Sequence, residues 1–342
     1  MDTILVTGGC GFIGSNFIRH VLQEQLVAKL INVDLLTYAG NPANLADFED
    51  DERYVFYRAD IADEEAINEI LSTHQVDVLL NFAAESHVDR SIVDPQAFVR
   101  TNLVGTSTLL NAARKQNVPR YIQISTDEVY GSLSFDDPAF TEQTALNPRN
   151  PYSAAKAGGD MLVLAHEHTF GINACVTRCS NNYGPYQFPE KLIPLMLLNA
   201  MDGKPLPVYG TGENIRDWIH VEDHCRGIAA VLQHGQTGRV YHFGGDCELQ
   251  NIDVVRRIIE AAGASEEQIT YVKDRPGHDM RYAMNFEETT KELGWTPRIS
   301  FEEGLAATAQ WYRDNQSWWK PIVSGDYLEW IEQWYGERKG AA

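Results

Sequence analysis

The sequence has no long hydrophobic run, few cysteines and few basic residues. Its longest apolar run, Leu192–Met201, has ten residues, well short of the ~20 that a membrane-spanning helix needs. Its five cysteines form no C-x-x-C pair, which favours free thiols in a reducing compartment over a disulfide framework. The first residues lack the basic start of a signal peptide. These absences predict a cytoplasmic protein that contacts no membrane.

The shortage of basic residues also bears on the ligand. The chain has 28 Lys and Arg against 48 Asp and Glu, a net charge of −20. A surface this negative repels nucleic acid, because binding there depends on neutralising phosphates with Lys and Arg. If the ligand is instead a phosphate ester, a few basic residues must form a positive pocket within an acidic body.

The order of apolar segments predicts the fold class. The chain has 342 residues, of which 44% are hydrophobic, so one large or two fused globular domains are expected. In the first half, short apolar strands alternate with longer amphipathic helices, a pattern typical of an α/β, Rossmann-type doubly wound parallel sheet. The predicted strands are 3–7, 29–34, 54–58, 76–81, 121–125 and 173–178, and the predicted helices are 12–25, 64–73, 95–116 and 152–170.

After Gly184 the pattern loosens, and prolines interrupt short elements. This favours a dinucleotide-binding domain at 1–183 followed by a smaller C-terminal substrate-binding lobe at 184–342, with helices at 221–233, 252–262, 286–293 and 301–315. The boundary is open, because residues 218–220 and 240–243, within the stretch 216–245, are candidate strands that return to the first sheet.

A glycine-rich turn follows the first predicted strand. Gly8, Gly11 and Gly14 open a helix, and Asp34 ends the next strand twenty residues after Gly14. Glycines permit a tight turn and close approach of a pyrophosphate, while the carboxylate accepts hydrogen bonds from ribose hydroxyls and repels a 2′-phosphate. The motif therefore predicts NAD rather than NADP, with Asp60 and Ile61 suited to the adenine edge.

A reactive pair is expected at the start of the helix at 152–170. Tyr152 and Lys156 are spaced i,i+4 and so share one helix face. A cation beside a phenol lowers its pKa and makes it a usable base. Thr126, at the end of a neighbouring strand, is placed to bond the same substrate oxygen.

These motifs resemble the extended short-chain dehydrogenase/reductase superfamily and, within it, the dTDP-glucose 4,6-dehydratases. The resemblance runs nearly end to end, to residues 330–333. One small departure is Cys10, which stands where alanine is usual. The segments that carry the resemblance are 34–41, 83–91, 124–131, 179–186, 188–194, 216–218 and 274–279.

Asp127 and Glu128 distinguish this chain from relatives that only epimerise carbon 4. Those relatives resemble Ser-x-x-x-Tyr-Gly at this position and lack the acidic pair. Removing water across carbons 5 and 6 needs both a base and an acid, and two carboxyl groups with different pKa values supply them. A solvated or helix-capping acidic turn is the alternative interpretation of the pair.

The resemblance implies a reaction and a set of site residues. Tyr152 takes the carbon-4 hydroxyl proton as hydride passes to NAD, Glu128 takes the carbon-5 proton, Asp127 protonates the leaving oxygen, and hydride returns to carbon 6. The implied cofactor contacts are Gly8, Gly11, Phe12, Ile13, Gly14, Asp34, Leu35, Thr37, Asp60, Ile61, Ala83, Ala84, Ser86, Thr101, Tyr152, Lys156 and Asn182. The implied substrate contacts are Ser86, His87, Thr126, Asn181, Lys191, Leu192, Pro207, Val208, Tyr209, Arg216, Asn251, Arg275 and His278.

Three further expectations accompany this interpretation. His220 and His224 are spaced to face one ion, but no H-E-x-x-H motif or cysteine pair completes a site, so no metal is predicted. His87 is as consistent with a structural role as with a ligand contact. The resemblance also implies a homodimer through the helices at 95–116 and 152–170.

Other functions remain open from the sequence. A UDP-sugar 4,6-dehydratase, 4-epimerase or decarboxylase uses the same scaffold, and a non-catalytic NAD-sensing protein is a different class. The intact Tyr152/Lys156 pair argues against the sensor. Thymidine and uridine differ at the base by one methyl group, worth only about 1 kcal/mol, so the sequence does not decide between them.

Overall fold

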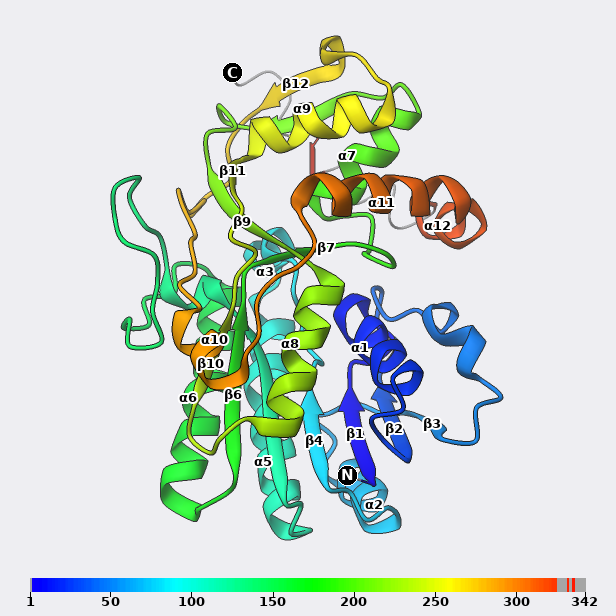
Figure 1. Ribbon diagram of the computed structural model, residues 1–342, viewed down its shortest axis with the longest axis vertical. Coiled ribbons are helices and arrows are strands. Elements are labelled where there is room, and N and C mark those ends of the chain that lie inside the picture. The colour runs from blue at the N-terminus through cyan, green and yellow to red at the C-terminus, as the bar shows by residue number, and fades with distance from the viewer. Residues whose placement is uncertain (1, 325–330, 332–333, 336–342) are drawn as a thin grey trace.

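The computed structural model describes residues 2–324, 331, 334 and 335. Its centre is a seven-stranded parallel sheet in the order β10-β6-β5-β4-β1-β2-β3, with helices on both faces (Figure 1). The chain reverses direction across the sheet between β1 and β4, the switch point where doubly wound folds bind ligands. The prediction of a Rossmann-type α/β fold is confirmed.

The strands and helices of the described residues have the following bounds. The strands are β1 Thr3–Thr7, β2 Lys29–Asp34, β3 Tyr54–Arg58, β4 Val78–Asn81, β5 Arg120–Thr126, β6 Ala174–Cys179, β7 Asn181–Tyr183, β8 Leu206–Tyr209, β9 Ile215–His220, β10 Val240–Phe243, β11 Glu248–Gln250 and β12 Ile269–Val272. The α-helices are α1 Phe12–Gln23, α2 Glu64–Thr73, α3 Val88–Val93, α4 Pro95–Phe98, α5 Thr106–Lys115, α6 Pro151–Phe170, α7 Leu192–Met201, α8 Val221–His234, α9 Asn251–Ala262, α10 Glu287–Leu293, α11 Phe301–Asp314 and α12 Gln316–Ile322. The 3₁₀-helical segments are η1 Pro42–Phe48, η3 Asp127–Tyr130 and η4 Glu266–Gln268, and the π-helical segment is η2 Val99–Gly105.

The central strands are mostly apolar because both faces of the sheet are covered. Along β1, Ile4 and Val6 pack into one core with α1 and α8, whereas Leu5 packs into the opposite core with α2, α5 and α6. This alternation follows from the two-residue period of a strand. The carboxyl ends of the strands are thereby held at one edge of a rigid sheet.

The predicted helix at 95–116 is interrupted. Between α4 and α5 the chain forms a π-helical segment, η2. Within it the buried side chain of Asn102 accepts a hydrogen bond from the backbone N–H of Glu85 and donates one to its carbonyl, both 2.9 Å. A π-helical turn of this kind is often found at functional sites, and here it fixes the loop that follows β4.

The two candidate returning strands behave differently. β10 pairs in parallel with β6 and completes the main sheet. β9 instead joins a three-stranded sheet, β11-β9-β7, in the second lobe, because its partners β7 and β11 lie beyond the carboxyl end of the main sheet. We therefore propose that the first unit ends at Ser180, before β7, and also includes α8, β10 and α10.

The second lobe lies above the carboxyl end of the main sheet (Figure 1). Helices α7, α9, α11 and α12 form its own core, with residues such as Leu197, Ile258 and Tyr312 fully buried. The last residues of the predicted lobe, 325–330, 332–333 and 336–342, lie outside the described residues, as does most of the resembling segment 330–333. Among the helices that the structure describes, none is long and apolar enough to span a membrane.

Candidate active site

A large cavity opens at the switch point of the main sheet. It encloses about 1580 Å³, part of which is open to solvent. All seventeen residues predicted to hold the cofactor line it, from Gly8 to Asn182. The five predicted reactive residues line it as well: Thr126, Asp127, Glu128, Tyr152 and Lys156.

The glycine turn at the base of this cavity cannot accept larger residues. Gly8 has a φ of +67°, and a Cβ atom there would lie 2.6 Å from the backbone of Ala83. A Cβ on Gly14 would lie 2.4 Å from the carbonyl oxygen of Gly8. Gly11, the N-cap of α1, has no side chain to cap the first N–H groups of the helix. Such a turn fits a pyrophosphate, which those N–H groups and the helix dipole attract.

Asp34 is held firmly at the side of the turn. Its Oδ2 accepts the N–H of Cys10 at 2.9 Å, and its Oδ1 accepts the N–H of Leu36 at 2.8 Å. The carboxylate retains free lone pairs toward the cavity, as ribose recognition requires. Both oxygens of Asp60 are engaged as well, but one of the partners is the charged side chain of Arg100, at 2.6 Å, and the other is the N–H of Ala62, at 2.8 Å.

The reactive residues come from two neighbouring elements. Thr126 ends β5, and the turn η3 that follows carries Asp127 and Glu128. Asn150 starts α6 with a capping box, which fixes Tyr152 in the first turn of that helix. The Asn150 amide nitrogen lies 3.5 Å from Oε2 of Glu128. One residue therefore joins the acidic turn to the helix that carries the tyrosine.

The expected effect of Lys156 on Tyr152 is outweighed by burial. Burial raises the pKa of the Tyr152 phenol well above its usual value, and the charge of Glu128 raises it further. The Nζ of Lys156 donates to the carbonyl oxygen of Ile124 at 2.6 Å. The helical spacing correctly placed both residues in one cavity, but spacing carries no information about desolvation or about this backbone acceptor.

The two adjacent acids lie in different electrostatic surroundings. Burial raises the pKa of Asp127 well above its usual value, and the negative charges of Glu128 and Asp217 add to this. Burial also raises the pKa of Glu128, but Arg275, Arg216 and Lys191 oppose the rise. The surroundings thus favour the protonated form of Asp127 and, by comparison, the ionised form of Glu128. Among the described residues, Oδ2 of Asp127 has no hydrogen-bond partner.

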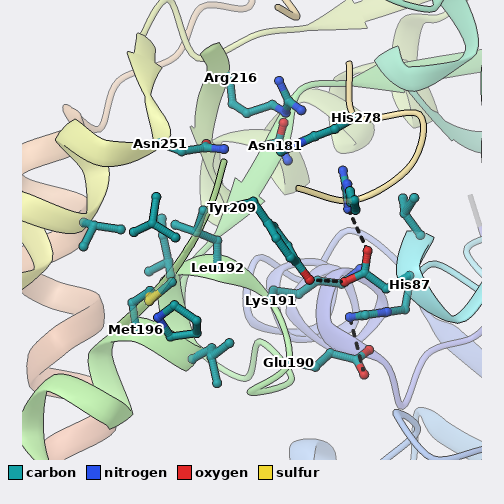
Figure 2. A pocket seen from close by; sticks show the side chains of 18 of the residues that line it. His87, Asn181, Glu190, Lys191, Leu192, Met196, Tyr209, Arg216, Asn251 and His278 are labelled. Atoms are coloured by element: carbon teal, nitrogen blue, oxygen red, sulfur yellow. Dashed lines mark hydrogen bonds and ion pairs between the residues drawn. The ribbon is translucent and has the colours of Figure 1, made fainter. Parts of the chain in front are cut away.

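A second cavity of about 1030 Å³ adjoins the first, between the main sheet and the second lobe. Glu128, Asn181 and Lys191 line both cavities. Figure 2 shows the labelled side chains of Arg216, His278, Tyr209 and Lys191 around this space. Of the predicted substrate residues, those that line the second cavity are His87, Asn181, Lys191, Leu192, Pro207, Val208, Tyr209, Arg216, Asn251, Arg275 and His278. Ser86 and Thr126 line the first cavity instead.

The second cavity is lined by three basic and three acidic side chains, the acidic ones being Asp89, Glu128 and Glu190, and it contains unpaired polar atoms. The side chains of Lys191, Arg216 and Arg275 all reach it. Within the described part of the chain, Asn181 Oδ1, Asn251 Oδ1 and Arg275 Nε are buried without a hydrogen-bond partner. Because buried polar groups are nearly always bonded, these atoms indicate a polar ligand that donates hydrogen bonds to the two amide oxygens and accepts one from Arg275.

Comparisons with known proteins agree with this geometry. A family model described as GDP-mannose 4,6 dehydratase matches residues 5–308. The chain is 51% identical over 360 residues to dTDP-glucose 4,6-dehydratase 1 of Escherichia coli K12, covering 98% of this chain and 99% of the relative. It is 49% identical to a dTDP-glucose 4,6-dehydratase of Streptomyces niveus, covering 94% and 96%. The chain belongs to the dTDP-glucose 4,6-dehydratase family.

Solved structures support the same assignment. A dTDP-glucose 4,6-dehydratase from Streptomyces venezuelae with NAD bound is 47% identical, with a TM-score of 0.91, covering 94% of this chain and 99% of that one. A UDP-glucose 4-epimerase from Thermotoga maritima is 28% identical, with a TM-score of 0.85, covering 92% and 99%. The scaffold is shared with epimerases, and the higher identity to the dehydratases confirms the predicted family.

Some residues of this dehydratase-family site were not predicted. The buried carboxylate of Asp217 accepts the N–H groups of Gly245 and Cys247, both at 2.9 Å, and its charge acts on Asp127. Glu190 accepts hydrogen bonds from Tyr38 at 2.8 Å and Arg90 at 3.2 Å. Both acids lie within segments that resemble the family, but no local pattern assigns a role to a single acid.

His220, His224 and His278 each make a hydrogen bond within the fold. His220 caps α8 through the N–H of Glu222, and Nδ1 of His224 lies 2.9 Å from Oδ1 of Asn182. Burial lowers the pKa of His224 to about 3. His278 pairs with Asp274 at 2.6 Å, and burial together with two arginines lowers its pKa to about 3. The described residues contain no group of three or more potential metal ligands.

Proposed function

We propose that this protein converts dTDP-glucose to dTDP-4-keto-6-deoxyglucose, using bound NAD as a hydride carrier. The observation that carries the proposal is the position of Asp127 and Glu128, side by side where a dinucleotide-sized cavity meets a second cavity that Lys191, Arg216 and Arg275 reach. Their surroundings favour one protonated and one ionised carboxyl group. Elimination of water requires such a pair.

The glycine turn and Asp34 hold the cofactor in this proposal. The N–H groups at the start of α1 bind the pyrophosphate, and the anchored carboxylate of Asp34 accepts the ribose hydroxyls. When bound, NAD accepts a hydride from carbon 4 of the sugar and later supplies one to carbon 6. The NAD bound in the Streptomyces venezuelae relative supports this cofactor.

Tyr152 is the base for the oxidation in this scheme. Its phenol is raised in pKa by burial and by Glu128, so it requires a cationic environment to ionise. Lys156 supplies one such charge, and its own pKa is lowered by burial while Asp160 opposes that change. Thr126 orients the same substrate hydroxyl, and its side chain opposes the rise in the pKa of Tyr152.

Glu128 and Asp127 then carry out the elimination. The 4-keto group acidifies the carbon-5 hydrogen, and Glu128, surrounded by Arg275, Arg216 and Lys191, removes it. Asp127, whose pKa is raised by burial and by its acidic neighbours, donates its proton to the leaving carbon-6 oxygen. A carboxylate base and a carboxylic acid thus act on adjacent carbons.

The second cavity accommodates the nucleoside diphosphate. Lys191, Arg216 and Arg275 neutralise the phosphates within an otherwise acidic protein. Arg275 is itself oriented by Asp89 at 3.2 Å, and Asp89 also accepts the hydroxyl of Tyr209 at 2.9 Å. This links the phosphate-binding arginine to Pro207, Val208 and Tyr209, the proposed base-binding edge.

We also propose a cytoplasmic homodimer. All five cysteines are free, as expected in a reducing compartment. Val99, Val104 and Met161 are 39%, 46% and 58% exposed on η2 and α6, two segments that pack together. Apolar side chains gathered on one such surface are typical of a subunit interface.

Met161→Glu tests the dimer. Light scattering is expected to give twice the chain mass for the parent and the chain mass for the variant, because a buried unpaired charge opposes association. Phe135→Glu is a matched control, since Phe135 is 52% exposed in a different loop. A parent that is monomeric at micromolar concentration would contradict the proposal.

Asp34→Ala tests the cofactor assignment. The variant loses the acceptor for the ribose hydroxyls, so the purified protein is expected to contain less NAD(H) than the parent. The nucleotides are released by denaturation, NAD(H) is separated from NADP(H), and each is then quantified by absorbance. Unchanged NAD(H) content, or a parent that prefers NADP(H), would sink the assignment.

Glu128→Gln and Asp127→Asn test the division of labour between the acids. In Glu128→Gln the carbon-4 oxidation is expected to survive, seen as NADH absorbance, while exchange of the carbon-5 proton with deuterated solvent stops. In Asp127→Asn the rate is expected to recover with a substrate that carries fluoride at carbon 6, because fluoride leaves with less acid assistance. Equal responses of the two variants to the fluoro substrate would show the assignment to be wrong.

A further inference from the structure

A chain of hydrogen bonds between buried side chains lies behind the reactive residues, and none of the proton or hydride transfers above passes through it. It consists of Asp160 on α6, Arg178 on β6, Tyr130 at the end of η3, and His242 on β10. All four residues are at most 3% exposed. None of them lines either cavity.

The distances make the chain continuous. Arg178 donates through Nε to Oδ2 of Asp160 at 2.9 Å and through Nη1 to the hydroxyl of Tyr130 at 2.6 Å. The Tyr130 hydroxyl lies 2.6 Å from Nε2 of His242, and Nδ1 of His242 lies 2.9 Å from the carbonyl oxygen of Asn285.

Only one arrangement of protons satisfies these bonds. The Asn285 carbonyl can only accept, so Nδ1 of His242 carries the hydrogen and Nε2 is the acceptor. Burial lowers the pKa of His242 to about 3, which agrees with a neutral ring. Tyr130 therefore donates its single hydroxyl hydrogen to His242 while it accepts from Arg178. A hydroxyl fixed in both roles holds a position and does not transfer a proton.

The chain connects the two elements that carry the chemistry. Asp160 is four residues beyond Lys156 and eight beyond Tyr152, so the three share one face of α6. Tyr130 closes the short turn that begins with Asp127 and Glu128. Arg178 bonds both elements from β6, a strand of the rigid sheet.

We propose that Asp160, Arg178, Tyr130 and His242 position the acid–base pair by fixing turn η3 against helix α6. This inference rests on the proposed function. Tyr130 and its three partners are positioning residues, because they hold Asp127 and Glu128 without touching substrate. Misplacement of a reacting group by about 1 Å can cost on the order of 10²-fold in rate, so the elimination should depend on this chain more than the oxidation does.

Tyr130→Phe removes the hydroxyl at the centre of the hydrogen-bond chain and keeps the aromatic ring. The ring stays packed against Phe140, whose centroid is 4.9 Å away. On mixing with dTDP-glucose, NADH is expected to appear at a rate within about twofold of the parent, while product forms roughly tenfold more slowly. NADH should then accumulate, and the KM should change little.

Tyr121→Phe is the matched control. Tyr121 is also fully buried on β5 and donates its hydroxyl to Gln123 at 2.8 Å, but it lines neither cavity. It should lose stability without accumulating NADH. Arg178→Lys is a second route to the same test, because lysine keeps the charge opposite Asp160 but lacks the fork that also reaches Tyr130. It should reproduce the accumulation.

The outcomes separate the inference from the proposed function. A parent that forms no product from dTDP-glucose would overturn the function itself. An active parent whose Tyr130→Phe and Arg178→Lys variants slow oxidation and product formation equally would overturn the positioning role alone. Accumulation of NADH in Tyr121→Phe as well would also overturn it, since any loss of a buried hydroxyl would then suffice.

Discussion

The proposed chemistry depends on one constraint: two adjacent carboxyl groups, those of Asp127 and Glu128, are buried among different charges. Burial raises the pKa of both carboxyl groups. The charges of Glu128 and Asp217 raise the pKa of Asp127 further, with Arg216 opposing them, whereas Arg275, Arg216 and Lys191 all oppose the rise at Glu128. Two carboxyl groups side by side in water titrate almost together, so the protein must supply this asymmetry. It does so from different parts of the chain: Asp217 comes from β9, and Arg275 from the segment before α10.

The same asymmetry explains how an acidic protein accommodates an anionic ligand. The net charge of −20 is spread over the chain, while Lys191, Arg216 and Arg275 converge on one cavity. Their charges have two effects, because they attract phosphates and also favour the ionised form of Glu128. In the proposed function, substrate binding and base activation therefore draw on the same three side chains.

Short sequence patterns predicted the features that depend on neighbouring residues, such as the glycine turn and the ends of the first strands. Gly8 and Gly14 could be picked out in the sequence because the turn leaves no room for a side chain at either position. The strands β1, β2 and β3 have the bounds that the apolar runs predicted. The sequence could not predict the π-helical segment at η2, which depends on Asn102 meeting Glu85 across the fold. Nor could it predict that β9 leaves the main sheet, or that Asp217 lies ninety residues away from Asp127 in sequence yet acts on it. Burial of Tyr152 is likewise a tertiary effect, and it reversed the expected direction of the pKa shift.

The most direct test of this account is the product formed from dTDP-glucose by the parent protein in deuterated water. The paired acids predict a 4-keto-6-deoxy product that has lost one water and carries solvent deuterium at carbon 5, since the base removes that hydrogen and the site replaces it. UDP-glucose in a parallel reaction measures the preference for the base. A product of the same mass as the substrate, with no deuterium at carbon 5, would indicate epimerisation and contradict the account.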